Sequence, residues 1–216
     1  RRACLIMKKA CLFLYGASSA LMIYSTVFQL QHQLYAKLGY LAMALGVQMI
    51  GPLVVKGLKL KDAWGLLFWT QLFIAIAMII GNTLNGYAIP YFDKVLHFSS
   101  GILICAAITL VYCWLKQQWT EDSFRHYLLK CLSIQGINMM IAFLWECFEF
   151  ACLIFLNIDA INHYTQGVYD TMTDMIVCFL GGLVFLALLT RQERKGKKDP
   201  LIQSLKAFYD TNLKDR

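Results

Sequence analysis

Two glutamates, Glu146 and Glu149, stand three residues apart inside an apolar stretch of the sequence, residues 144–150. A carboxylate in hydrocarbon is costly, so intramembrane acids usually face a bundle interior and serve an ion, a proton or a substrate. Two other apolar stretches carry similar groups: Asp93 with His97, and Asp170 with Asp174. Because residues three or four apart share one helical face, each pair projects from one side of its helix.

Carboxylates gathered in apolar surroundings must be partly protonated or bind cations. Oxygen ligands with one imidazole suit Mg²⁺, Mn²⁺, Ca²⁺ or Zn²⁺, and such an ion could position a lipid phosphate or activate water. A carboxylate beside His97 could also act as a general base without a metal. The candidate metal ligands are Asp93, His97, Glu146, Glu149, Asp170 and Asp174. Catalysis is assigned to Glu146, Glu149 and His97, and substrate binding to Lys94, Asn82, Asn85 and Tyr169.

Several of these residues also have ordinary structural explanations. Asp93 and Asp170 could each cap the start of a helix, as Asp commonly does. Lys94 could be a snorkelling anchor or the partner of one carboxylate. Glu146, Glu149 and Asp174 have no capping explanation, so they carry most of the functional argument.

The composition places these residues in a membrane protein. Of 216 residues, 59% are hydrophobic and 15% are charged, whereas soluble domains carry about 25% charged residues. The net charge of +7 comes from basic residues between apolar runs and at the two ends. Because no aromatic residues alternate with them on a polar face, we expect membrane lipids and no nucleic acid as partners.

The sequence predicts an all-α, polytopic membrane helix bundle, since about 20 apolar residues span a bilayer. The six predicted spans form one transmembrane domain, 1–190, and cover residues 10–30, 35–55, 64–83, 95–115, 131–156 and 169–190. The basic tail, 191–216, is predicted to be either a short amphipathic helix at the membrane surface or disordered.

Lysine and arginine positions indicate the orientation of the spans. They gather before the first span, between the second and third, between the fourth and fifth, and after the sixth. The positive-inside rule therefore predicts that both termini are cytoplasmic. Glu146 and Glu149 then lie roughly 10–17 Å below the outer end of their span. The three pairs are predicted to meet in an acidic pocket in the extracytoplasmic half of the membrane.

The motifs Asp93-Lys94-x-x-His97, Trp145-Glu146-x-x-Glu149 and Tyr169-Asp170-x-x-x-Asp174, the last followed by Gly181-Gly182, resemble the YjdF-type bacterial inner-membrane family. That family is similar in motif order to VanZ-like proteins, which are associated with low-level glycopeptide resistance. The resemblance covers roughly residues 60–190. This chain has Glu149 where VanZ-like proteins commonly have glutamine, and it lacks their asparagine after Asp174. The resemblance implies a multi-pass protein of the bacterial plasma membrane with a role in the cell envelope.

Three functions remain open at this level. The first is a membrane-embedded, metal-assisted enzyme that hydrolyses or transfers a lipid or lipid-linked envelope intermediate. The second is an ion- or proton-coupled transporter that uses the same acids, which predicts polar groups continuing toward the cytoplasm, such as Gln135 and Asn138. The third is a non-catalytic membrane partner or sensor in which the acids only hold helices together.

Overall fold

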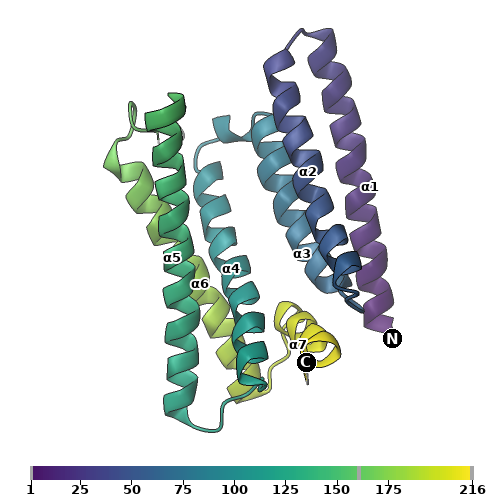
Figure 1. Ribbon diagram of the computed structural model, residues 1–216, viewed down its shortest axis with the longest axis vertical. Helices are drawn as coiled ribbons and strands as arrows, with labels where there is room; N and C mark the ends of the chain where they lie inside the picture. The colour runs from purple at the N-terminus through teal and green to yellow at the C-terminus, as the bar shows by residue number, and fades with distance from the viewer. Residues whose placement is uncertain (1, 160–161, 215–216) are drawn as a thin grey trace. The chain divides into compact units, whose positions relative to one another are not determined.

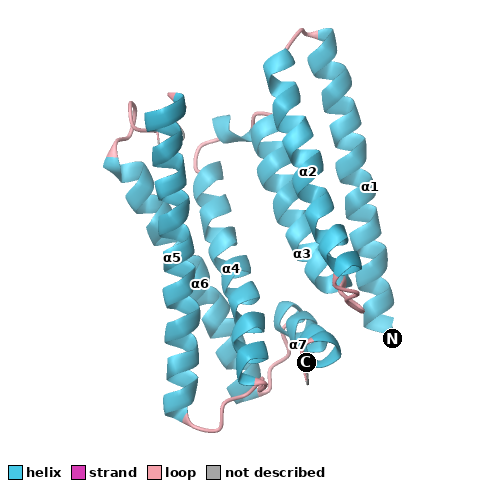
Figure 2. Ribbon diagram, viewed as in Figure 1, coloured by secondary structure: helices cyan, strands magenta, loops and turns pink. Residues whose placement is uncertain are grey.

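The computed structural model describes residues 2–159 and 162–214, and this part of the chain is helical, without a strand (Figure 2). The α-helices are α1 (Arg2–Gln31), α2 (Tyr35–Gly57), α3 (Trp64–Ile74), α4 (Phe92–Lys116), α5 (Phe124–Leu156), α6 (Val168–Lys195) and α7 (Pro200–Asn212). A π-helix (Ala75–Thr83) continues α3, and a short 3₁₀ turn (Gly86–Ala88) precedes α4. The all-α prediction is confirmed.

Five helices in the described residues are long and apolar enough to cross a membrane. They cover Leu5–Gln31, Trp64–Thr83, Phe92–Lys116, Phe124–Leu156 and Val168–Lys195. The apolar part of α2, Leu41–Gly57, falls among the shorter helices of 10–17 residues. The sixth crossing and the cytoplasmic location of both termini therefore stay predictions, as does the single transmembrane domain.

The chain divides into two compact units. The first contains residues 1–92 and 203–216, and the second contains residues 93–202. In the first unit α1, α2 and α3 run side by side (Figure 1). Its hydrophobic core includes Leu41, Ala44 and Ile79.

Helix α7 forms in the tail, where the sequence allowed either a helix or disorder. Its apolar residues Leu205, Phe208 and Tyr209 are buried. Asn212 fixes the end of this helix, because its side chain accepts a hydrogen bond from the backbone N–H of Lys61 and donates one to the Lys61 carbonyl, both at 2.7 Å. Placement of this helix at a membrane surface stays a prediction.

The second unit is built from α4, α5 and α6, and α4 crosses α6 at backbone contact. A Cβ added to Gly101 would collide with the Cys178 carbonyl oxygen, and one added to Gly181 would collide with that of Phe98. Small residues at both positions let the two backbones approach, as is common between membrane helices. This crossing fixes the depth of α4 against α6 and hence which of their polar residues face each other.

Replacing Gly181 with alanine is expected to lower the free energy of unfolding by about 1–3 kcal/mol, because the added methyl group overpacks a backbone contact. Gly136→Ala is the matched control: Gly136 lies inside α5 with nothing within 4 Å of its would-be Cβ. The control should be neutral or stabilising by up to about 1 kcal/mol, since alanine is the better helix former. Denaturant unfolding in detergent measures both. Equal stability of the two variants would contradict the close crossing.

Candidate functional site

Lys94 connects α4 to α6 near the N-terminal end of each helix. Its Nζ donates to Asp170 Oδ1 at 2.5 Å and to Asp174 Oδ1 at 2.8 Å. Both aspartate side chains are almost fully buried, and Asp93 Oδ2 lies 3.6 Å from the same ammonium. Since breaking a buried pair leaves an uncompensated charge, this ion pair must form whenever α4 packs on α6. The sequence suggested Lys94 as the partner of one carboxylate, but it joins two.

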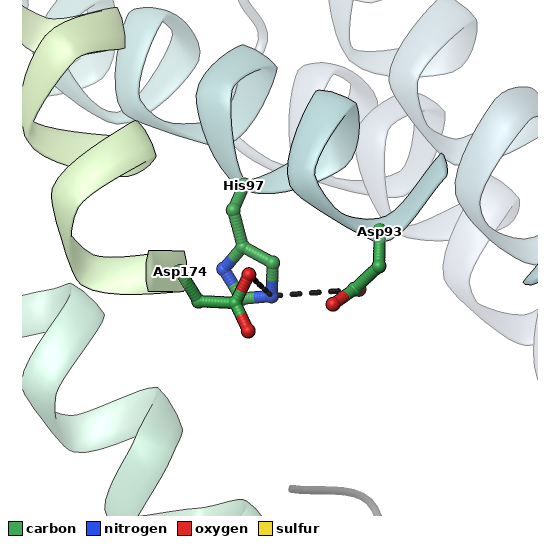
Figure 3. Close-up of side chains that lie close together, drawn as sticks. All are labelled: Asp93, His97 and Asp174. Carbon is green, nitrogen blue, oxygen red and sulfur yellow. Dashed lines mark ion pairs between the residues drawn. The ribbon is translucent and has the colours of Figure 1, made fainter. Parts of the chain in front are cut away.

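His97 lies between two carboxylates (Figure 3). Its Nε2 is 3.6 Å from Asp93 Oδ1, one turn earlier on α4, and 3.8 Å from Asp174 Oδ1 on α6. These separations are too long for good hydrogen bonds. One ligand atom from each of the three residues lies within 4.8 Å of the others, so the group could hold a metal ion.

Glu146 brings α5 into the same site. Its side chain is only 6% exposed and interacts electrostatically with His97 and Asp174. Thr171 is its hydrogen-bonding neighbour on α6, while its Oε2 is buried with no hydrogen-bond partner. A buried carboxylate oxygen without a partner is costly, so a water, a proton, a cation or a ligand is expected to satisfy it.

Glu149 lies at the edge of the site, on a half-buried face of α5. The indole Nε1 of the exposed Trp145 donates to its Oε1 at 2.8 Å. Electrostatic interactions link Glu149 to Glu146, Asp93 and Asp174. We refer to the seven side chains from the three helices as the polar cluster: Asp93, Lys94, His97, Glu146, Glu149, Asp170 and Asp174.

The remaining predicted residues are not part of this network. Tyr169 begins the same turn of α6 as Asp170, but its side chain is 76% exposed. Asn82 and Asn85 belong to the first unit, where Asn82 Nδ2 contacts the Ala77 carbonyl of the π-helix at 3.5 Å. Roles for these three residues in substrate binding stay predictions.

Two polar neighbours were not anticipated from the sequence. Asn162, in the loop before α6, donates from Nδ2 to Asp170 Oδ2 at 2.7 Å. Together with Lys94 it occupies both oxygens of Asp170, which explains that aspartate without a capping role. Thr171 follows Asp170 in the sequence, but its hydrogen bond to Glu146 depends on how α5 packs against α6, which the sequence does not give. No spacing rule would have identified Asn162, because its position depends on a loop.

Buried polar groups continue along α5 from Glu146 to Gln135, about three helical turns. Cys178 donates to Asn138 Oδ1 and Cys105 donates to Gln135 Oε1, both at 3.7 Å. Asn138 is fully buried, and its Nδ2 has no hydrogen-bond partner. Further along α5 and α6, between Gln135 and the Lys130–Glu193 ion pair, the sequence positions are occupied by three fully buried apolar side chains: Ile134, Phe185 and Leu189.

The charges of the polar cluster do not balance. The cluster contains five carboxylates and one ammonium, that of Lys94, which already donates to two of the aspartates. Protonation or cation binding must reduce this excess in an apolar environment. Ligand atoms bonded to one cation at about 2.1 Å lie roughly 3.0–3.4 Å apart. The ligand atoms of Asp93, His97 and Asp174 lie within 4.8 Å of one another and would have to move closer to reach that geometry, and their chemistry, two carboxylates and one imidazole, fits a divalent cation.

Lys94→Met is expected to destabilise the protein by about 3–5 kcal/mol, because it leaves Asp170 and Asp174 buried without their cation. The control is Lys206→Met, which removes an exposed ion pair with Asp210 on α7. Such pairs contribute at most about 1 kcal/mol. Thermal and denaturant unfolding of both variants in detergent provide the measurement. A Lys94→Met protein as stable as the control would show that the ion pair does not hold α4 on α6.

Comparison with known proteins supports the membrane assignment. Residues 10–195 match the family described as "Predicted membrane protein (DUF2238)". No curated protein and no solved structure matches the chain. The family match covers most of the chain, includes the whole polar cluster and confirms the resemblance to the YjdF-type family. Because the match extends over residues 10–195 of 216, the chain belongs to this family of predicted membrane proteins.

Proposed function

We propose that this protein is a membrane-embedded enzyme that binds a divalent cation in the polar cluster and hydrolyses or transfers a phosphate-bearing lipid or lipid-linked envelope intermediate. The expected location is the bacterial plasma membrane, with the cluster toward the extracytoplasmic leaflet. The observation that carries the proposal is the convergence of His97, Asp93 and Asp174, because one carboxylate oxygen of each aspartate lies 3.6 or 3.8 Å from His97 Nε2.

The cation ligands would be His97 and Asp93 from α4 and Asp174 from α6. The Asp174 oxygen near His97, Oδ1, already accepts from Lys94 at 2.8 Å. The cation would therefore share Oδ1 with the ammonium or take Oδ2, since each carboxylate oxygen can accept more than one partner. A bound divalent cation would polarise a phosphoryl oxygen and offset its charge. The unpartnered Oε2 of Glu146 supports a role for this residue as the base.

In hydrolysis, Glu146 would take a proton from water as the new phosphorus–oxygen bond forms. The departing oxygen would gain a proton as the old bond breaks, so that one water is consumed. Lys94 would hold Asp170 and Asp174 in place, and its positive charge would favour an approaching phosphate. Glu149 and the exposed Trp145 lie at the edge of the cluster, on the surface of α5, where a lipid headgroup could approach from the bilayer.

A transporter is the second candidate, because buried polar groups extend inward as far as Asn138 and Gln135. Beyond them the fully buried Ile134, Phe185 and Leu189 are apolar, and the hydroxyl of the buried Thr109 is taken up by the Cys105 carbonyl of its own helix. A site that ends within the membrane suits a reaction at one leaflet better than passage across both. The non-catalytic role is separated from the enzyme by the experiment below.

Glu146→Gln is expected to reduce turnover by about 10²–10⁴-fold, which is the usual contribution of a general base. The assay follows phosphate release from vesicles that contain phosphatidic acid or a polyprenyl diphosphate, with Mn²⁺ or Mg²⁺ supplied. Turnover should also stop in the presence of a chelator and return with the metal. Glu121→Gln, outside the polar cluster, is the matched control and should keep wild-type turnover.

Retained Mn²⁺ binding by Glu146→Gln, measured by titration calorimetry, would show that the variant still folds around the site. If the wild-type protein releases no phosphate from either lipid, the proposed enzyme is wrong. If Glu146→Gln is as active as wild type, Glu146 is not the base. Normal cellular function of a Glu146→Gln strain at normal protein level would favour the purely structural role.

A further inference from the structure

The first unit contains a groove that the proposed function does not use. This cavity of about 560 Å³ lies among α1, α2 and α3, within the range typical of ligand-binding pockets. Its lining consists of Leu12, Tyr15, Pro52, Val55, Lys56, Lys59, Leu60, Trp64 and Leu67, all within the first unit. We call it the lysine groove.

The lining of the lysine groove separates into an apolar wall and a basic rim. Aliphatic side chains from three segments form the wall, and the exposed Leu12 shows that it opens at the protein surface. Lys56 and Lys59, both exposed, supply two ammonium groups, and the lining contains no carboxylate. The charge of the groove is therefore complementary to an anion that carries an apolar chain.

A third lysine stands beside this rim. Lys8 Nζ lies 5.2 Å from the ring centroid of Trp64, which lines the groove. Trp and Lys together are typical of the boundary between hydrocarbon and headgroups, where an amphipathic ring meets the polar layer. The rim thus fits the depth of a lipid phosphate, and the wall fits the depth of an acyl chain.

Local contacts hold together the helices around the groove. Pro52 lies inside α2, and a Cβ on Gly51 would lie 3.0 Å from Leu67, so α2 and α3 are in contact just beside the groove. Tyr15 donates to the Gln48 carbonyl at 3.4 Å and so links α1 to α2. At the rim, Lys59 has a positive φ of 52° in the turn that follows the end of α2 at Gly57.

From this arrangement we propose that the lysine groove binds an anionic phospholipid, with an acyl chain along the apolar wall and the phosphate at Lys56 and Lys59. Lipid tails are as apolar as the wall, so burial of the chain contributes little selectivity within a bilayer. Selectivity comes from the lysines, since basic pockets between membrane helices attract anionic headgroups.

Native mass spectrometry of the full chain, delipidated in detergent and titrated with lipid, tests this proposal. Phosphatidylglycerol should bind at one site at least tenfold more tightly than phosphatidylcholine of the same chains. Lys56→Gln/Lys59→Gln should weaken phosphatidylglycerol binding roughly 20- to 30-fold, because each lysine contributes about 1 kcal/mol. The control, Lys197→Gln/Lys198→Gln, removes the same charge from the exposed tail and should bind as wild type.

A second variant, Val55→Trp, keeps both lysines and fills the wall. It should also lose phosphatidylglycerol binding, and inorganic phosphate at the same concentrations should not compete. Equal binding of the two lipids, or equal loss in the rim and tail variants, would overturn the proposal. Effective competition by inorganic phosphate would overturn it as well, because the groove would then recognise a free anion and not a lipid.

Discussion

The pairing of Lys94 with Asp170 and Asp174 is the constraint on which the rest of the site depends. Two buried carboxylates and a partly buried ammonium in an apolar bundle are stable only within a few ångströms of one another, so they set the register of α4 against α6. The glycine crossing a few turns deeper allows the same approach by removing side chains from the contact. Because His97 lies three residues after Lys94 on α4, the same register places His97 opposite Asp174. Helix α5 then contributes Glu146 to the same site. The approach of Asp93 and Asp174 to His97 Nε2 follows from helix packing and does not depend on a loop.

Much of this site was predictable because it depends on helical periodicity. Apolar runs predicted the helices, and spacings of three and four residues predicted which acids share a face, as Asp93 and His97 do. The predicted orientation of the spans placed Glu146 and Asp174 in the same half of the membrane. The double engagement of Lys94 was not predictable, since sequence gives the charge of a side chain but not its reach between helices. Asn162 lies in a loop whose path has no periodic signal, so its bond to Asp170 could be found only from coordinates.

The two units divide the chemistry of the chain. The second unit gathers the acidic side chains of the polar cluster, whereas the first has basic residues around a groove with an apolar wall. A protein that acts on lipids would benefit from both, but each stands on its own contacts: the polar cluster on ion pairs and the lysine groove on shape and charge.

The central claim is that a divalent cation occupies the space between His97, Asp93 and Asp174. The most direct measurement is an anomalous difference map from crystals of the protein grown with Mn²⁺ and collected at a wavelength where manganese scatters anomalously. We predict one strong peak about 2.1–2.3 Å from His97 Nε2 and from an oxygen of each aspartate, with Lys94 still bound to Asp170. A map without a peak there, at Mn²⁺ concentrations that saturate ordinary protein sites, would contradict the account.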